Sequence, residues 1–383
     1  MELHSKKNIR VLHFYKTCYP YSFGGVEQVI HQLCLGGLQH GVINEVLVLS
    51  SEGAEESIEV DGYKVHRVKQ AFQIASTGFS FSALRRFKEL AKQADIIHYH
   101  FPWPFMDLIH FLARVDKPTV VSYHSDIVRQ KLLLKFYRPL KNKFLKNVDC
   151  IVSASPNYLA SSDVLSRFKS KVKVIPYGLD KDSYPQPSPE IMSKWKNIVG
   201  DKFFLFLGVL RYYKGLHVLL EALKDTDYPT VIAGAGPIED ELKLHAKKLG
   251  LKNVIFLNEI SDVDKAALFT LCYGVVFPSH LRSEAFGISL LEGAMYGKPM
   301  ISSEIGTGTT FINIDRKTGL VVPPSDEKSL KEAMDYLWEN PSKSQLMGKM
   351  ASERYHELFT AEKMIVSYIE LYNELAPPIG GVL

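Results

Sequence analysis

The sequence has few cysteines and no long apolar run. Its four cysteines are Cys18, Cys34, Cys150 and Cys272. They are too far apart for a metal-binding or redox pair, and their spacing predicts no disulfide framework, so we expect a reducing compartment. No segment reaches the roughly 18 consecutive apolar residues that a membrane-spanning helix needs. The first apolar run, residues 9–15, is interrupted by Arg10 and His13, which indicates a first strand and not a signal peptide.

A strong excess of one charge is also absent. The chain has 46 Lys and Arg against 42 Asp and Glu, which gives a formal net charge of +4. This balance does not indicate a nucleic-acid binder, but it suits anionic small molecules or an anionic membrane surface. The 383 residues, 46% of them hydrophobic, exceed one ordinary α/β core, so we expect two domains.

Short runs rich in β-branched and aromatic residues alternate with helical patterns along the chain. In the first half, we predict strands at residues 9–15, 45–50, 95–100, 118–123, 150–154 and 171–176, and helices at 25–40, 82–93 and 129–146. In the second half, we predict strands at 203–207, 230–233, 254–257, 274–277, 299–302 and 319–322, and helices at 215–223, 238–249, 262–271 and 285–296. This alternation predicts α/β domains with parallel sheets.

A proline-rich stretch at residues 184–189 separates the two halves, because its three prolines cannot continue a sheet or a helix interior. We therefore predict an N-terminal domain over residues 1–182 and a C-terminal domain over 183–360. A last helix at 361–376 is expected to pack back on the first domain. Both domains would be Rossmann-like, doubly wound parallel sheets facing a cleft, and such sheets bind ligands at the carboxyl ends of their strands.

One segment follows a predicted strand and opens a predicted helix. It carries Glu284 and, eight residues later, Glu292, which on a continuous helix would lie roughly 12 Å apart along the axis. The N–H groups of Phe286 and Gly287, in the helix N-terminus before Ile288, could hold phosphates between the two carboxylates. One carboxylate would bind a hexose and the other a ribose diol. The alternative is an acidic residue at a helix start and an unrelated surface glutamate.

Several motifs occur in the order found in retaining glycosyltransferases with the GT-B fold. They are the Glu-x7-Glu pair at 284 and 292, Gly24-Gly25-Val26-Glu27, His98-Tyr99-His100, residues 121–126, residues 175–180, Lys214-Gly215 and Gly234-Ala235-Gly236-Pro237. Over nearly its whole length the chain therefore resembles this family, in particular glycosyltransferase family 4. The resemblance implies a GT-B fold, with the acceptor in the N-terminal domain and the nucleotide sugar in the C-terminal domain.

Further stretches, at residues 11–17, 99–107, 211–216, 278–287 and 304–309, resemble bacterial O-antigen mannosyltransferases. This resemblance implies a retaining α-mannosyltransferase that moves mannose from GDP-mannose to N-acetylglucosaminyl-diphospho-undecaprenol, with an α-1,3 linkage, in lipopolysaccharide assembly. GDP-D-rhamnose or a UDP-sugar stays open as the donor, because no residue indicates guanine over uracil. A non-catalytic sugar-nucleotide-binding subunit of a polysaccharide complex also stays open. A nicotinamide-dependent oxidoreductase is disfavoured by the poor glycine fingerprint.

On the donor side, the resemblance assigns Lys214 to the departing diphosphate, where a cation stabilises developing charge. The family usually has an arginine five residues earlier. Here that position is Val209, and Arg211 could replace the arginine. Gly236 belongs to a turn that either lines the nucleotide pocket or only joins a strand to a helix. No metal or other cofactor is expected, because the lysine and backbone N–H groups would hold the diphosphate.

The first domain offers six candidates: Gly24, Gly25, His98, His100, His124 and Asp126. The glycine pair follows the first strand and would let the backbone approach the donor diphosphate, unless it is only a tight turn. His124 ends a predicted strand and would contact the transferred sugar, so that with Lys214 and Glu284 it forms the expected catalytic set. His98 and His100 share one face of a strand and, with Asp126, are expected to bind the acceptor.

The predicted helix at residues 129–146 is basic and amphipathic. Its basic residues are Arg129, Lys131, Lys135, Arg138, Lys141, Lys143 and Lys146, and no acidic residue lies among them. The pattern is typical either of a solvated basic face or of a patch that meets anionic lipid headgroups or a lipid-diphosphate acceptor. We therefore expect a cytoplasmic protein that binds peripherally to the inner face of the cytoplasmic membrane.

Overall fold

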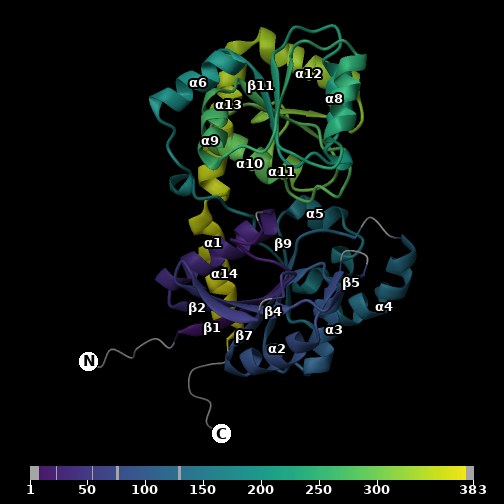
Figure 1. The fold of residues 1–383 in the computed structure, drawn as a ribbon, viewed down its shortest axis with the longest axis vertical. Helices are drawn as coiled ribbons and strands as arrows, with labels where there is room; N and C mark the ends of the chain where they lie inside the picture. The colour runs from purple at the N-terminus through teal and green to yellow at the C-terminus, as the bar shows by residue number, and fades with distance from the viewer. Residues whose placement is uncertain (1–7, 23, 54, 75–76, 128–130, 377–383) are drawn as a thin grey trace. The chain divides into compact units, whose positions relative to one another are not determined.

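The structure is a computed structural model that describes residues 8–22, 24–53, 55–74, 77–127 and 131–376 (Figure 1). Contacts divide the chain into two units. The first comprises the chain up to Ala154, together with Ser162–Gly178 and the segment from Ala361. The second comprises Ser155–Ser161 and Leu179–Thr360. Each unit has its own parallel sheet and is described by itself.

The first unit contains an eight-stranded sheet in the order β10-β9-β8-β7-β1-β2-β4-β3. Its strands are β1 (Ile9–Phe14), β2 (Val42–Ser50), β3 (Glu56–Val60), β4 (Tyr63–Lys69), β7 (Ile96–Phe101), β8 (Thr119–Tyr123), β9 (Cys150–Ser153) and β10 (Val172–Val174). Neighbouring strands pair in parallel, apart from β3 and β4. A separate antiparallel pair consists of β5 (Phe72–Ile74) and β6 (Thr77–Phe79).

Two groups of helices pack in the first unit. Helix α1 (Gly25–Gln39) packs against α14 (Ala361–Leu375), while α3 (Pro104–Ala113) packs against α2 (Phe81–Gln93) and α4 (Lys131–Asn147) (Figure 1). The sheet between them is deeply buried, because every residue of the central strand β7 is buried. Apolar side chains on such strands supply the core, so the polar ones among them need hydrogen-bond partners.

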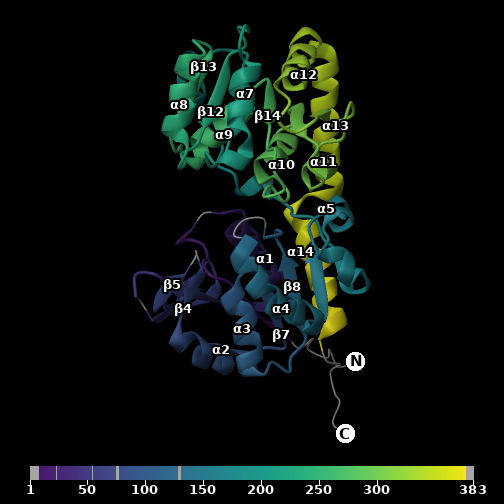
Figure 2. The ribbon, with the colours of Figure 1, turned by 90° about the vertical axis from the view of Figure 1, so that its right-hand side faces the viewer.

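The second unit contains a six-stranded, fully parallel sheet in the order β13-β12-β11-β14-β15-β16. Its strands are β11 (Phe204–Leu207), β12 (Thr230–Ala233), β13 (Val254–Leu257), β14 (Gly274–Phe277), β15 (Met300–Ser303) and β16 (Gly319–Val322). Helices lie on both sides of this sheet (Figure 2). They are α6 (Pro189–Val199), α7 (Leu216–Ala222), α8 (Glu239–Lys248), α9 (Asp262–Leu271), α10 (Ile288–Met295), α11 (Thr309–Ile312), α12 (Glu327–Glu339) and α13 (Pro341–Leu358).

The predicted fold class is confirmed, since both units are Rossmann-like parallel sheets covered by helices. The predicted strands match observed ones within a few residues, but β3 to β6 were not predicted. β3 is a polar edge strand whose residues are mostly exposed, so it lacks the apolar pattern of a central strand. The signal that could have found it is the Asp61-Gly62 turn, where both residues have positive φ and join β3 to β4.

The boundary between the two units lies before the proline-rich stretch in the chain. The predicted boundary at residues 182/183 moves to Gly178 and Leu179. Leu179 is tied to the second unit because its N–H donates to Phe359 O at 2.9 Å and its carbonyl accepts from the Tyr355 hydroxyl at 2.8 Å. The predicted linker at 184–189 therefore lies inside the second unit. The short helix α5 (Pro156–Ser161) also belongs to that unit, where Asn157 donates to Thr310.

Candidate functional site

Lys214 and Glu284 form a buried ion pair in the second unit. Lys214 ends the short 3-10 helix Tyr212–Lys214 after β11, and its Nζ lies 2.5 Å from Glu284 Oε2. The hydroxyl of Ser279 donates to the same carboxylate oxygen at 3.1 Å. Each member of the pair is only 8% exposed. Salt screens buried charges only weakly. The Lys214 ammonium can therefore stabilise an anion that approaches this ammonium.

The backbone beside Lys214 admits only glycine. Gly215 has a φ of 71°, and a Cβ there would lie 2.0 Å from the carbonyl oxygen of Pro278. This close approach, together with the hydrogen bond from His280 N to Tyr213 O at 3.0 Å, packs the 3-10 helix against the end of β14. The local sequence therefore positions Lys214 against Glu284 through backbone contacts.

Helix α10 begins at Ile288, three residues later than predicted. Gly287 precedes it with a φ of 101°, which interrupts the helical path, so the spacing of roughly 12 Å derived from a continuous helix does not apply. Phe286 is 2% exposed, and a Cβ on Gly308 would lie 2.4 Å from its ring. The packed loop fixes the start of α10, whose first-turn N–H groups have no intrahelical acceptors and favour an anion.

Glu292 lies one turn inside α10 and is 3% exposed. Its Oε1 accepts a hydrogen bond from the Tyr184 hydroxyl at 2.8 Å and lies 3.2 Å from Lys265 Nζ. Burial raises the pKa of Tyr184, and Glu292 adds to that rise, so the phenol stays protonated. The partners of Glu292 are thus different from those of Glu284. Tyr184 and Lys265 were not among the predicted residues, because nothing in their sequence neighbourhood indicates this contact.

The two remaining donor-side candidates differ in their surroundings. Arg211 is exposed at the N-cap of the 3-10 helix that carries Lys214. Gly236 packs against the backbone of Leu210, since a Cβ on Gly236 would lie 2.3 Å from the Leu210 carbonyl oxygen. Glycine at 236 is therefore required by close backbone packing after β12, whatever else the turn does.

In the first unit, the glycine pair opens helix α1. Gly24 is its N-cap and Gly25 its first residue. The Glu27 carboxylate folds over this turn, because a Cβ on Gly24 would lie 2.3 Å from Glu27 Oε2. Thr17 and Ser22 donate to Glu27 Oε1 at 2.5 and 3.2 Å. A phosphate at this helix start would thus meet a carboxylate as well as N–H groups.

His124 follows β8 directly and is 7% exposed. Its Nε2 lies 3.0 Å from His100 Nδ1, and its Nδ1 lies 2.5 Å from the Tyr177 hydroxyl. Both ring nitrogens therefore have protein partners, and contact of His124 with the transferred sugar stays a prediction, in which a sugar hydroxyl would have to replace one of them. Asp126 is half-buried and accepts hydrogen bonds from Tyr123 at 2.8 Å and Ser162 at 2.9 Å.

The expectation that His98 and His100 bind the acceptor is corrected by their burial. Both side chains are completely buried in the middle of the first sheet. His98 bonds through Nδ1 to the Tyr372 hydroxyl at 2.7 Å and through Nε2 to the Ser122 hydroxyl at 2.8 Å. Period two placed the two histidines on one face of β7 as predicted, but that face is covered by α14, which carries Tyr372.

The two parallel-sheet units and the buried Lys–Glu pair beside a helix start fit a glycosyltransferase of the GT-B type. Residues 187–354 match the family model described as glycosyl transferases group 1, and residues 23–183 match that of glycosyltransferase family 4. The chain belongs to this glycosyltransferase family and is a hexosyltransferase. It is 58% identical over 92% of its length to a D-rhamnosyltransferase of Pseudomonas aeruginosa, 93% of which is covered. It is 51% identical over 96% of its length to an O-antigen chain mannosyltransferase of Escherichia coli, 99% of which is covered.

Solved structures agree on the fold. Sucrose-phosphate synthase from Thermosynechococcus elongatus superposes with a TM-score of 0.81 at 20% identity, covering 96% of this chain and 99% of that one. The Anabaena protein HepE in complex with UDP and glucose gives 0.76 at 20% identity, covering 96% and 100%. At this identity the likeness concerns the GT-B fold alone.

Proposed function

We propose that the chain is a retaining α-mannosyltransferase of O-antigen assembly that transfers mannose from GDP-mannose to a lipid-diphosphate-linked N-acetylglucosamine, with an α-1,3 linkage. The observation that carries the proposal is the buried Lys214–Glu284 pair beside the start of α10. The O-antigen chain mannosyltransferase among the relatives supports the sugar and the pathway. GDP-D-rhamnose is the second candidate donor, because the D-rhamnosyltransferase is 58% identical to this chain.

In the proposed reaction, the bond between the anomeric carbon and the diphosphate oxygen breaks, and GDP leaves with the electron pair. The acceptor hydroxyl oxygen forms the new bond on the same face of the sugar, and its proton passes to a phosphate oxygen of the leaving GDP. Lys214 and the N–H groups at the start of α10 stabilise the charge on the diphosphate. Glu284 holds hexose hydroxyls and Glu292 the ribose. No metal or other cofactor takes part in this scheme.

The deciding experiment incubates the purified protein with a synthetic N-acetylglucosaminyl-diphospho-lipid and one donor at a time: GDP-mannose, GDP-D-rhamnose or UDP-glucose. We expect transfer from GDP-mannose, with an α-1,3 linkage and a retained anomeric configuration by NMR. Transfer from GDP-D-rhamnose alone would replace mannose in the proposal. Binding of a donor without transfer to any acceptor would support a non-catalytic sugar-nucleotide-binding subunit.

The same assay tests the absence of a cofactor. EDTA is added to one series and excess Mg²⁺ or Mn²⁺ to another. We expect equal rates in both, because the cationic charge at the diphosphate comes from Lys214 and from backbone N–H groups. Loss of transfer in EDTA that a divalent ion restores would overturn this part of the proposal.

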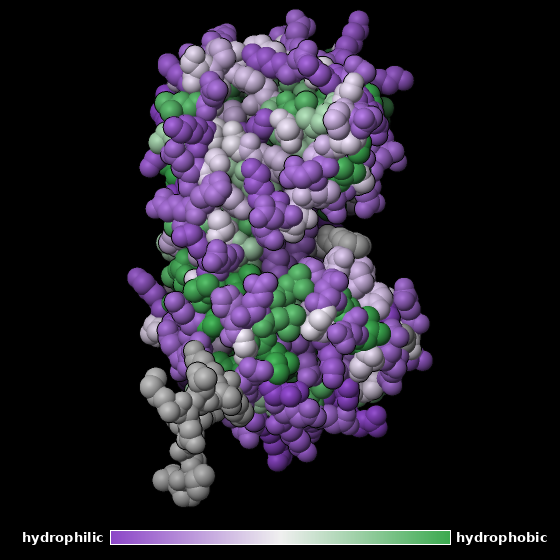
Figure 3. Space-filling view, turned by 90° about the vertical axis from the view of Figure 1, so that its left-hand side faces the viewer, coloured by the Kyte–Doolittle hydropathy of each residue, from purple (hydrophilic) through white to green (hydrophobic). Residues whose placement is uncertain are grey.

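We also propose that the protein acts in the cytoplasm, on the inner face of the cytoplasmic membrane. Among the described residues, no helix combines the length and the apolar character needed to cross a bilayer. Apolar residues gather on one face of the unit that holds the N-terminus, drawn in Figure 3, which is the side turned away from α4. Of the side chains that the structure describes, the two most exposed large apolar ones, Phe81 at 82% and Phe136 at 83%, also belong to that unit. Contact with anionic lipids would bring the enzyme to a lipid-linked acceptor.

A further inference from the structure

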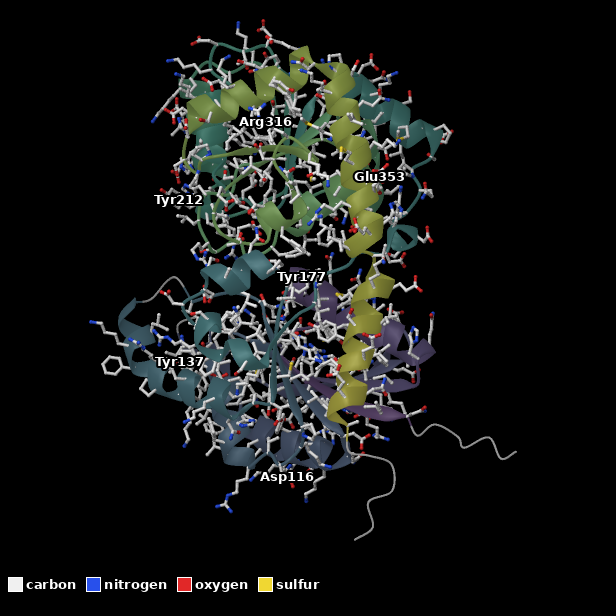
Figure 4. All side chains as sticks on the ribbon, turned by 180° about the vertical axis from the view of Figure 1, so that it is seen from behind. Asp116, Tyr137, Tyr177, Tyr212, Arg316 and Glu353 are labelled. Atoms are coloured by element: carbon white, nitrogen blue, oxygen red, sulfur yellow. The ribbon has the colours of Figure 1, made fainter. Side chains whose placement is uncertain are left out.

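A continuous chain of hydrogen bonds runs through the core of the first unit, from Asn44 to Tyr177. Asn44 Oδ1 lies 3.1 Å from His13 Nε2, and His13 Nδ1 lies 3.0 Å from His100 Nε2. His100 Nδ1 lies 3.0 Å from His124 Nε2, and His124 Nδ1 lies 2.5 Å from the hydroxyl of Tyr177, which is labelled in Figure 4. These five residues are called the histidine chain below. The adjacent strands β2, β1 and β7 and the end of β8 bring its first four members together.

Asn44 determines which atom donates and which accepts in the first hydrogen bond of this chain. Its Nδ2 donates to the backbone carbonyls of Leu33 at 3.2 Å and Cys34 at 3.4 Å. Because a carbonyl oxygen only accepts hydrogen bonds, the amide nitrogen must face α1 and the amide oxygen must face His13. His13 Nε2 therefore has to carry a proton. Flipping the amide would turn its oxygen against two other oxygens in a buried place, which is costly.

The same order of donor and acceptor holds in every later hydrogen bond of the chain, because each imidazole ring is neutral. Burial lowers the pKa of His13 to about 4, although the bond with Asn44 opposes this, and burial holds the pKa of His100 well below its usual value. Burial, helped by Lys16, lowers the pKa of His124 to about 3. A neutral imidazole has one N–H and one bare nitrogen. Each Nδ1 must then accept from the next Nε2, and His124 Nδ1 accepts from the Tyr177 hydroxyl.

We propose that Asn44, acting through His13 and His100, holds His124 as the tautomer with its proton on Nε2, so that His124 Nδ1 can only accept a hydrogen bond. Resting on the proposed function, this makes His124 an acceptor for a hydroxyl of the transferred sugar, which replaces the Tyr177 hydroxyl when the donor binds. His124 is then neither a general acid nor a general base. Asn44, His13 and His100 are positioning residues, which act through His124.

Other ionisable groups face the chain from the elements packed around it. They are Tyr15 and Lys16 after β1, Cys34 on α1, His98 on β7, and Tyr368 and Tyr372 on α14. Ring nitrogens of His13, His98 and His100 also lie within 4.8 Å of one another, a spacing that a metal ion could use. The hydrogen bonds engage both nitrogens of all three rings, so a metal would have to displace them.

The tautomers can be measured without any activity assay. In ¹⁵N-labelled full-length protein, long-range ¹H–¹⁵N correlation spectra distinguish the two neutral tautomers and the charged ring. We expect His13, His100 and His124 to be neutral with Nε2–H from pH 8 to pH 5, and unchanged by added Zn²⁺. A proton on Nδ1 of any of the three, titration within that range, or a Zn²⁺-dependent shift would overturn the proposal.

The variant Asn44→Asp tests the link to catalysis. A carboxylate beside His13 stabilises the imidazolium, so acid charges His13 and its Nδ1–H then donates towards His100, which reverses the protons up to His124. We expect kcat to fall about tenfold between pH 8 and pH 5.5 in this variant. Tyr372→Phe removes a buried hydroxyl from His98, outside the chain, and should keep the wild-type profile.

The outcomes of the two experiments separate the proposals. A wild-type profile in Asn44→Asp, with His13 shown to be charged by its ¹⁵N shifts, would overturn the role assigned to His124. If Asn44→Asp does not fold, the wild-type spectra decide. If those spectra show the expected tautomers but the protein transfers no sugar from any donor, the proposed function fails while the directed chain stands.

Discussion

Lys214–Glu284 and Lys243–Glu239 have the same Nζ–Oε distance of 2.5 Å but different surroundings. The first pair is buried, whereas the Lys243 side chain is 43% exposed. Removing one member of a buried pair leaves an uncompensated charge, which typically costs about 3 kcal/mol, while a surface pair is worth about 0–1 kcal/mol. We predict this difference for Lys214→Met against Lys243→Met in urea unfolding of the second unit.

The same two variants should also differ in the rate of sugar transfer. If Lys214 stabilises the leaving diphosphate, Lys214→Met lowers kcat by about a hundredfold or more, and Lys243→Met leaves it unchanged. Equal effects on stability and on kcat would mean that the buried pair is solvated and plays no part in the site. Arg211→Ala, measured beside them, tests whether this exposed arginine replaces the family arginine absent at Val209. Unchanged kcat would make it a surface residue only.

Glu292 and Tyr184 share one hydrogen bond, so paired variants separate packing from ribose binding. Tyr184→Phe loses the bond at a cost of about 1 kcal/mol, whereas Glu292→Gln keeps an acceptor for the Tyr184 hydroxyl but loses the charge that faces Lys265, so we expect both variants to melt at a lower temperature. If the carboxylate also binds the ribose diol, only Glu292→Gln raises the donor KM, by about tenfold. Equal donor KM values in both variants and in the wild type would confine Glu292 to packing.

The start of helix α10 depends on Gly287, the residue that precedes the helix. An alanine there would hold a strained positive φ and place its Cβ 3.2 Å from the Phe277 ring. Gly250 has a φ of 70° with no atom within 4 Å of its Cβ position, so Gly250→Ala pays only the conformational cost. We predict that both lose about 1 kcal/mol or more in stability, but that only Gly287→Ala weakens GDP binding in calorimetry.

Helix α4 is the element proposed to meet the membrane. Lys135, Phe136 and Arg138 are exposed on it, whereas Lys141 is buried at 7%, and Arg129 lies outside the described residues. We predict that anionic vesicles sediment the protein, that salt weakens this binding, and that Lys135→Glu combined with Arg138→Glu reduces it strongly. The exposed Lys349→Glu on α13 is the charge control. Equal binding to neutral vesicles would contradict the electrostatic part.

Most elements could be predicted because buried parallel strands carry continuous apolar runs. The edge strand β3 could not, since its mostly exposed residues follow no such run. The start of helix α10 was predicted three residues too early. Residues 285–287 continue the helical pattern of α10, but the left-handed backbone of Gly287 ends it, and this conformation depends on the packing of Phe286 and Phe277.

The buried histidines predict that acid lowers the stability of the two units to different extents. The pKa of His13 falls from 6.5 to about 4 on folding, so the unfolded chain binds more protons between these values. The stability from neutral His13 is full above pH 6.5 and is lost as the pH falls towards 4, by about 3 kcal/mol. His98, His100 and His124 act in the same direction.

The second unit has the half-buried His217 and the buried His280, whose pKa values burial also lowers. We therefore predict that hydrogen exchange, followed by mass spectrometry from pH 7 to pH 4.5 with correction for intrinsic rates, shows protection lost mainly in β1, β7 and β8 of the first unit. His13→Asn should flatten that response. Equal losses in both units would contradict the contribution of the buried histidines.

The sequence by itself determined the class of fold, the family and the Glu-x7-Glu motif, because these depend on local periodicity and on short ordered motifs. Only the tertiary structure decided that Lys214 meets Glu284, that Glu292 meets Tyr184 and Lys265, and that His98 and His100 are buried. These contacts join residues tens of positions apart, and separation along the chain carries no information on which side chains a folded sheet brings into contact.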